Sequence, residues 1–195
     1  MPKVYVMPSA QINAFATGRN PQHAAVAVTQ GALEKLQNEE LEGVLAHEMS
    51  HIGNRDILVS TIVVVLAGII SVVADVFLRA SFWGGGDDDN RSPLIQVLAL
   101  VAAILAPLAA TMIQLAVSRK REFLADASGA LLTRYPEGLA NALVKIGYDE
   151  IPMRNARTSM AHLFLSNPFK GREKRNWFTN LFMTHPSLEE RIRIL

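Results

Sequence analysis

The chain has 195 residues, of which 50% are hydrophobic and 19% are charged, and its formal net charge is +1. This composition is too apolar for an average soluble domain and too charged for a protein that lies wholly within a bilayer. The lack of cysteine excludes disulfides and thiol catalysis. Because the chain also has no recognised DNA- or RNA-binding motif, we expect no nucleic-acid partner.

The first predicted elements are two short strands, residues 4–6 and 24–29, which are rich in valine and alanine. Residues 13–20 between them include Gly18 and are predicted to form a turn-rich connection. His23 follows this connection and is predicted to be a surface residue rather than a metal ligand. The strands predict a small sheet.

A helix is predicted from Asn38, its expected N-cap, and it contains His47-Glu48-Met49-Ser50-His51. In this H-E-x-x-H motif both imidazoles lie on one helix face and can bind a single Zn²⁺ ion. Glu48 lies within the apolar stripe of the helix, where a solvated surface glutamate is not expected. The motif therefore predicts one zinc ion per chain, with Glu48 as the general base that activates a zinc-bound water.

Two long apolar segments follow the motif, residues 57–78 and residues 94–117. The first is interrupted only by Asp75 and the second carries no charge, and each is long enough to cross a membrane. A buried hairpin in a soluble core is the alternative, but a domain of this size could hardly cover two such helices. We therefore predict a transmembrane helical hairpin inserted within a single domain over residues 1–195.

Basic residues predict the orientation of this hairpin. Arg55 precedes the first segment and residues 119–121, Arg-Lys-Arg, follow the second, whereas the connecting turn combines two arginines with three aspartates. Because cytoplasmic flanks are enriched in lysine and arginine, we expect the zinc site to face the cytoplasm. The predicted location is the cell (inner, cytoplasmic) membrane, with the chain crossing it more than once.

The segment after the second apolar run supplies the candidate third ligand. Glu122 and Asp126 are four residues apart on a predicted helix, so one carboxylate can bind zinc while the other accepts the distal N–H of a ligand histidine. Ala125, Gly129 and Ala130 are small and would let this helix approach the first closely. The spacing does not decide between the two carboxylates, and such pairs are also common on solvated helix faces.

Two further histidines lie in the C-terminal part of the chain, His162 and His185. His162 lies in an apolar run and is predicted to be a packing residue. His185 precedes Pro186, which restricts it to an extended or turn conformation suited to a loop end that projects a side chain. A zinc peptidase usually needs a side-chain donor beside the metal to stabilise the oxyanion, and His185 is the candidate catalytic residue for this role. The alternatives are a cap on the following helix and a resting-state ligand that fills the open position of zinc.

These motifs resemble the HtpX-type membrane metallopeptidases of family M48, which also includes the prenyl-protein peptidase Ste24. The matching segments run in family order over nearly the whole chain, at residues 13–18, 44–51, 121–126, 161–164, 184–186 and 190–192. The resemblance implies an α+β fold, mainly α, with a gluzincin-like metallopeptidase domain, a small β-sheet and the inserted hairpin. It also implies that His47, His51 and Glu122 bind zinc, that Glu48 is the base, and that Asp126 orients a ligand histidine.

The function that this resemblance implies is a membrane-associated zinc endopeptidase that hydrolyses peptide bonds in polypeptide substrates. Quality control of misfolded membrane proteins, as part of a stress response, is the expected role. The alternatives are a selective processing peptidase of Ste24 type and a membrane-anchored binding or chaperone-like module with structural zinc. Family members usually begin with two further spans, so we expect this form to be attached more weakly to the lipid bilayer.

Overall fold

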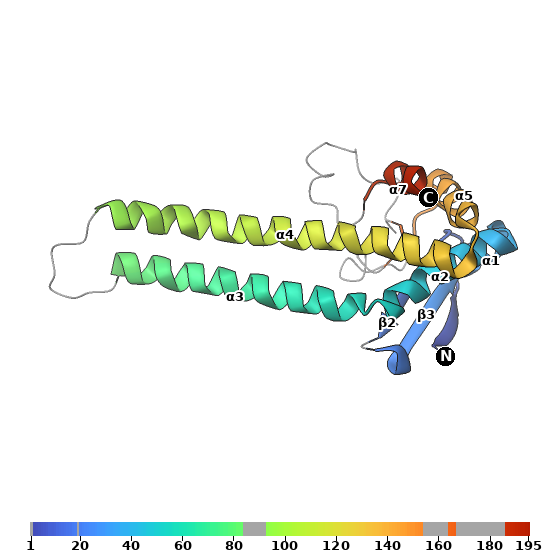
Figure 1. The fold of residues 1–195 in the computed structure, drawn as a ribbon, viewed down its shortest axis with the longest axis horizontal. Coiled ribbons are helices and arrows are strands. Elements are labelled where there is room, and N and C mark those ends of the chain that lie inside the picture. The colour runs from blue at the N-terminus through green and yellow to red at the C-terminus, as the bar shows by residue number, and fades with distance from the viewer. Residues whose placement is uncertain (1, 19, 84–92, 154–163, 167–185) are drawn as a thin grey trace. The chain divides into compact units, whose positions relative to one another are not determined.

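The computed structural model describes residues 2–18, 20–83, 93–153, 164–166 and 186–195 (Figure 1). It comprises two compact units, one made of residues 1–58 and 118–195 and the other of residues 59–117. The first unit contains a sheet and the helices that surround it. The second unit contains most of two long apolar helices.

The sheet of the first unit has three strands in the order β1-β3-β2, with β1 parallel and β2 antiparallel to β3. The strands are β1 (Lys3–Met7), β2 (Ala14–Gly18) and β3 (Ala24–Thr29). The predicted strands at residues 4–6 and 24–29 are confirmed, but the predicted turn at residues 13–20 is wrong because it contains β2. β2 combines two strand formers, Phe15 and Thr17, with alanines and a glycine that are depleted in strands, and pairing with β3 forms the strand. Gly18 ends it with φ of 131°, a backbone conformation that favours glycine.

Short helices follow the sheet and close the first unit: α1 (Gln30–Lys35), α2 (Asn38–Gly53), α5 (Pro136–Tyr148) and α7 (Leu188–Ile194). Helix α2 is capped by Gln37 rather than by Asn38, so the predicted cap is wrong by one residue. The Glu40 carboxylate accepts the Gln37 backbone N–H at 2.7 Å and pairs with Lys145 of α5 at 2.6 Å. The ionic contact explains why Glu40 is buried although it is an acid in the first turn.

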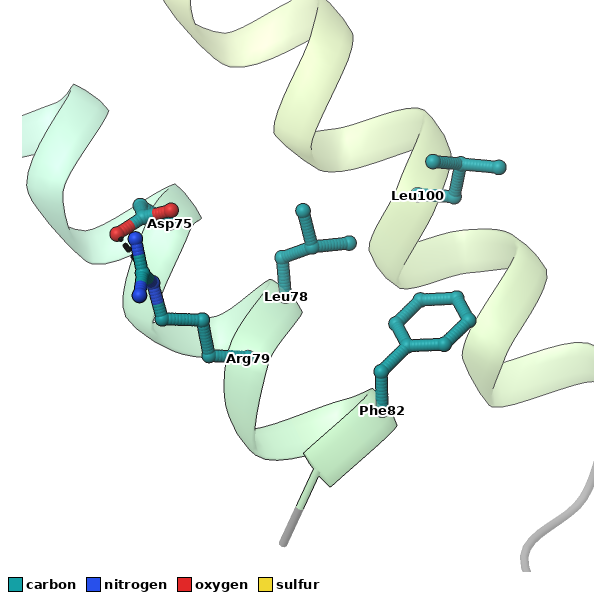
Figure 2. A pocket seen from close by; sticks show the side chains of 5 residues that line it. All are labelled: Asp75, Leu78, Arg79, Phe82 and Leu100. Atoms are coloured by element: carbon teal, nitrogen blue, oxygen red, sulfur yellow. Dashed lines mark hydrogen bonds and ion pairs between the residues drawn. The ribbon is translucent and has the colours of Figure 1, made fainter.

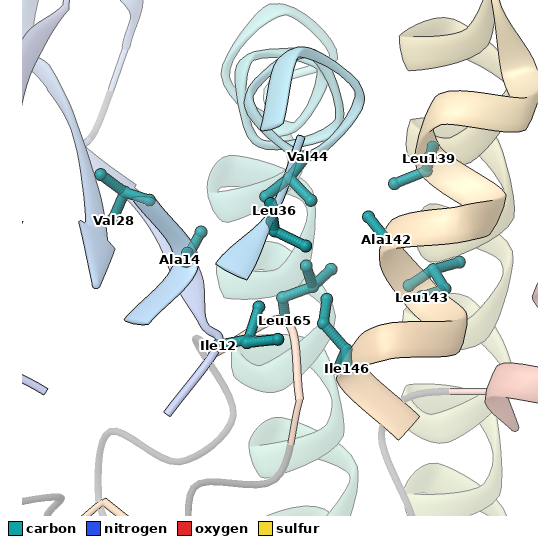
Figure 3. Packing of buried hydrophobic residues seen from close by; sticks show 11 residues of the cluster. Ile12, Ala14, Val28, Leu36, Val44, Leu139, Ala142, Leu143, Ile146 and Leu165 are labelled. Atoms are coloured by element: carbon teal, nitrogen blue, oxygen red, sulfur yellow. The ribbon is translucent and has the colours of Figure 1, made fainter. Parts of the chain in front are cut away.

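One apolar cluster joins the sheet to α2 and α5 (Figure 3). Its members are Ile12, Ala14, Val28, Ala32, Leu36, Val44, Leu139, Ala142, Leu143, Ile146 and Leu165. The α5 residues at helical spacing, Leu139, Ala142, Leu143 and Ile146, are fully enclosed. This cluster fixes α2, and therefore the H-E-x-x-H motif, against the sheet.

The two long helices are α3 (Asp56–Trp83) and α4 (Pro93–Thr133). Their most apolar stretches have mean hydropathies of 2.9 and 2.3, and among the described residues they are long and apolar enough to cross a membrane. In the second unit they lie side by side (Figure 1), and a shallow pocket between them is lined by Leu78 and Phe82 of α3 and Leu100 of α4 (Figure 2). An ion pair between Asp75 and Arg79 borders it. The fold is thus α+β, mainly α, with an inserted pair of apolar helices, as predicted.

Candidate metal centre

The structure brings the three predicted ligands together. His47 and His51 of α2 and Glu122 of α4 each offer a ligand atom, and these atoms all lie within 4.8 Å of one another. The two Nε2 atoms are 3.1 Å apart, and the Glu122 carboxylate lies 3.8 Å from His47 Nε2 and 3.5 Å from His51 Nε2. Two imidazole nitrogens and one carboxylate oxygen form a donor set that suits Zn²⁺. The residues therefore fit a metal ion.

Small residues of α4 allow this convergence. A Cβ added at Gly129 would lie 3.0 Å from the backbone nitrogen of His47 and 3.2 Å from its Cα. Ala125, one turn earlier, is completely buried. Since larger side chains here would separate the helices, the small residues bring Glu122 within reach of both histidines.

Asp126 occupies a different position from Glu122, although the spacing left the two exchangeable. Its carboxylate lies 2.9 Å from Nδ1 of His47, the ring nitrogen that faces away from the cluster. A proton held on Nδ1 by Asp126 leaves the Nε2 lone pair of His47 available for a metal. The geometry therefore supports the predicted roles of the two carboxylates. Glu122 offers an oxygen to the metal site, and Asp126 contacts the distal nitrogen of His47.

Arg191 of α7 is a site residue to which the sequence analysis gave no role. Its side chain is fully buried and donates to both oxygens of Asp126, with Nε at 2.8 Å and Nη2 at 2.6 Å. Its Nη1 lies 3.4 Å from Glu122. A signal was present: Arg191 shares a helix face with Leu188 and Leu195, which pack against the core, and an arginine in an apolar stripe needs a buried anion.

Asp56 was also missed. It begins α3, it is 6% exposed, and its Oδ2 lies 2.6 Å from Nδ1 of His51. It forms an ion pair with Arg121 of α4. The spacing of five residues between His51 and Asp56 spans the end of one helix and the start of another. No helical periodicity could therefore have linked them.

Burial dominates the protonation of His47 and Glu48. It lowers the pKa of His47 to about 4, with help from the Arg191 charge, so the ring is neutral and able to bind a metal at neutral pH. Burial raises the pKa of Glu48 to about 7. For Asp126, hydrogen bonds from His47 and Arg191 overcome burial and hold the pKa below its usual value, while Asp126 in turn raises that of Arg191.

Glu48 is 2% exposed, as its place in the apolar stripe predicted. The backbone amide of Ala16 in β2 donates a hydrogen bond to its carboxylate. This contact places the candidate base beside the strand that forms one edge of the sheet. A carboxylate with a pKa near 7 suits proton transfer at neutral pH.

Of the other three histidines, His23 lies among the residues that the structure describes, and it is not part of the cluster. His23 is exposed and its Nδ1 contacts Asn20, so its prediction as a surface residue is confirmed. His162 and His185 lie outside the described residues. The N-cap of α7 is Ser187, whose hydroxyl accepts the Glu190 N–H at 3.2 Å. The catalytic role of His185 stays a prediction.

An H-E-x-x-H helix, a candidate carboxylate ligand from a second helix and a small sheet together define a domain of metallopeptidase type. The whole chain, residues 1–195, matches Peptidase family M48, and the protein belongs to that family. It is 50% identical over 200 residues to a Protease HtpX homolog of Caldanaerobacter subterraneus, with all of this chain and 65% of the relative covered. It is 51% identical over 195 residues to one from Tropheryma whipplei, again with all of this chain and 66% of the relative covered.

The fold is also similar to a solved structure, the crystal structure of S. mikatae Ste24p. The TM-score is 0.60 at 22% identity, and the match covers 99% of this chain and 44% of that one. The chain spans about two thirds of the length of its HtpX relatives.

Proposed function

We propose that the protein is a membrane-associated zinc endopeptidase that hydrolyses peptide bonds in polypeptide substrates. The observation that carries the proposal is the convergence of His47, His51 and Glu122 around one point, with the buried carboxylate of Glu48 on the same helix. A structural zinc site would need four protein ligands, and the described cluster offers three. Three ligands with a nearby base favour catalysis.

In this proposal His47, His51 and Glu122 hold the zinc ion. When bound, zinc acts as a Lewis acid that polarises a peptide carbonyl and makes water acidic enough to deprotonate near neutral pH. Glu48 accepts the proton of the attacking water and then donates it to the leaving amine. Asp126 and Arg191 keep His47 oriented while these transfers take place.

The position of β2 supports recognition of an extended peptide. The strand pairs with β3 on one side; on its other side the Ala14 carbonyl accepts the Leu165 N–H at 3.0 Å, and the Ala16 amide contacts the base. A polypeptide aligned along this edge would be bound mainly through main-chain hydrogen bonds, which recognise many sequences. Such broad recognition suits the degradation of misfolded proteins, and the apolar helices suit substrates from the membrane.

The apolar helices support membrane attachment. Only 6% and 11% of their most apolar stretches are buried within the protein, although a helix in a soluble core would be mostly covered. Val64, Val72 and Ile104 are each at least 58% exposed. A bilayer would cover these side chains, and the basic flanks of the helices favour a site that faces the cytoplasm.

Casein digestion tests the activity. We expect the purified protein to cleave casein when zinc is present. Digestion should stop when a chelator removes the metal. Glu48→Gln should retain zinc but lose about 10²–10⁴-fold in rate, because glutamine preserves the shape and cannot accept the proton. Near-normal digestion by zinc-loaded Glu48→Gln would contradict the proposal.

Cysteine labelling tests the topology, because the chain has no cysteine of its own. A cysteine at Gly85, between α3 and α4, should react with an impermeant maleimide added outside intact cells. A cysteine at Gln37, before α2, should react only after the cells are opened. Equal labelling of both positions in intact cells would show that the helices do not span.

A further inference from the structure

Asp56 contacts the distal nitrogen of the second motif histidine. Its Oδ2 lies 2.6 Å from Nδ1 of His51, and its side chain is only 8% exposed. His51 itself is 19% exposed, so its ring is less enclosed by packing than that of His47. A partly exposed ring depends more on hydrogen bonding for its orientation, and the Asp56 carboxylate provides a close partner at Nδ1.

The backbone between the two helices places this carboxylate. Helix α2 ends at Gly53, and Arg55 then adopts a left-handed conformation with φ of 56°. A non-glycine residue rarely adopts this conformation, so the surrounding structure must favour the turn. The Asn54 N–H donates to Ser50 at 2.8 Å, and Arg121 donates to the Asn54 carbonyl at 2.6 Å. The turn brings Asp56 to His51 and is itself fixed by α4.

Arg121 connects this contact to the third ligand. It pairs with Asp56 and directly precedes Glu122 in α4. Arg121 pairs with one oxygen of this buried aspartate, and the other oxygen, Oδ2, is directed at His51. The same arrangement exists at the other histidine, where Asp126 contacts His47 and Arg191 pairs with Asp126. Each histidine of the motif thus has its own carboxylate, and each carboxylate has its own arginine.

From this repeated arrangement we propose that Asp56 is a positioning residue of the metal centre. It holds the proton of His51 on Nδ1 and directs Nε2 toward His47 and Glu122, as Asp126 does for His47. The inference rests on the proposed zinc site. The competing explanation is purely structural: an acid in the first turn of α3 stabilises the helix N-terminus, and its ion pair with Arg121 joins two helices.

Zinc affinity separates the two roles. In the full-length protein, zinc dissociation constants are measured by competition with a chromophoric chelator, beside thermal unfolding of the metal-free form. Asp56→Ala should bind zinc about 10–100-fold more weakly. Asp56→Asn, which still offers an oxygen to the His51 N–H, should lose less zinc affinity than Asp56→Ala. The absorption spectrum of the Co²⁺-substituted protein should change in Asp56→Ala, because a reoriented His51 alters the ligand field.

Asp149 provides the matched control. It is also a buried aspartate with a basic partner, Lys35, and it accepts the backbone N–H of Ile12 at 2.5 Å, but it is not among the cluster residues. Asp149→Ala should lower the unfolding temperature without changing zinc affinity or the Co²⁺ spectrum. Zinc affinity of Asp56→Ala within threefold of the parent, or a loss shared equally by Asp149→Ala, would overturn the inference. A parent protein that binds no zinc would instead reject the proposed function.

Discussion

Arg191 and Asp126 form a two-point ion pair in the interior of the first unit, although 65 residues separate them. Nε lies 2.8 Å from one carboxylate oxygen and Nη2 lies 2.6 Å from the other. Because Asp126 contacts His47, the C-terminal helix α7 contributes to the orientation of a candidate metal ligand. The candidate metal centre is therefore built from three separate parts of the sequence: α2 with the start of α3, the end of α4, and α7.

Arg191→Met should destabilise the protein by about 3–5 kcal/mol, because it removes the cation and leaves the Asp126 carboxylate buried without it. Arg191→Lys is the matched variant, since it keeps the charge but cannot make the two-point contact. We expect it to recover part of the stability. Thermal unfolding and zinc affinity are the measurements. Equal stability of Arg191→Met and the parent would show that the ion pair contributes nothing.

Alanine variants of the two α4 carboxylates, Glu122 and Asp126, should affect zinc binding to different extents. Glu122→Ala removes a proposed ligand and should abolish zinc retention during purification. Asp126→Ala leaves the ligands intact and should weaken zinc affinity by about 10–100-fold through a misoriented His47. Metal analysis of both purified variants decides the matter. Loss of zinc from Asp126→Ala alone would reverse the two assignments.

Gly129→Val should separate α2 from α4. Even a single added Cβ would approach the His47 backbone nitrogen to 3.0 Å, and valine adds two methyl groups to it. We expect weaker zinc binding and a free energy of unfolding that is lower by about 1–3 kcal/mol, as is typical for an overpacked contact. Gly147→Ala in α5 is the control, because its Cβ would meet only Leu188 at 3.6 Å. Equal behaviour of the two variants would argue against a close approach at Gly129.

The sequence predicted those parts of the structure that local chemistry determines. The H-E-x-x-H spacing placed two histidines on one face, and hydropathy predicted both apolar helices. It did not predict β2, because Phe15 and Thr17 are only two strand formers among alanines and a glycine, and the strand depends on pairing with β3. It also did not reveal that the second apolar segment and Glu122 belong to one helix, α4, which continues through Pro107.

The carboxylates and arginines behind the histidines were only partly accessible to sequence analysis. Asp126 was found because it lies one helical turn from Glu122. Arg191 was within a segment that matches the family, yet its role depends on a contact with α4 that no local pattern shows. Asp56 reaches His51 only because Arg55 turns the chain between two helices. A charged residue within an apolar stripe indicates a buried partner. This pattern predicted the burial of Glu48, and it is also present at Arg191.

The free energy of unfolding of the metal-free protein should depend on pH because Glu48 is buried. The pKa of Glu48 is about 7 in the folded protein and about 4.5 without burial, so the folded state holds this proton more tightly. Its contribution to stability is therefore complete below pH 4.5 and is lost as the pH rises toward 7. Glu48→Gln cannot ionise and should escape this loss.

The advantage of metal-free Glu48→Gln over the metal-free parent should thus grow between pH 4.5 and 7, to at most about 3 kcal/mol. Comparing the two proteins cancels the opposite effect of His47, whose lowered pKa destabilises both as the pH falls below 6.5. Denaturant unfolding with a chelator present, at several pH values, measures the difference. A difference that stays constant with pH would mean that the Glu48 carboxylate is ionised without cost, and that its environment is more polar than its burial implies.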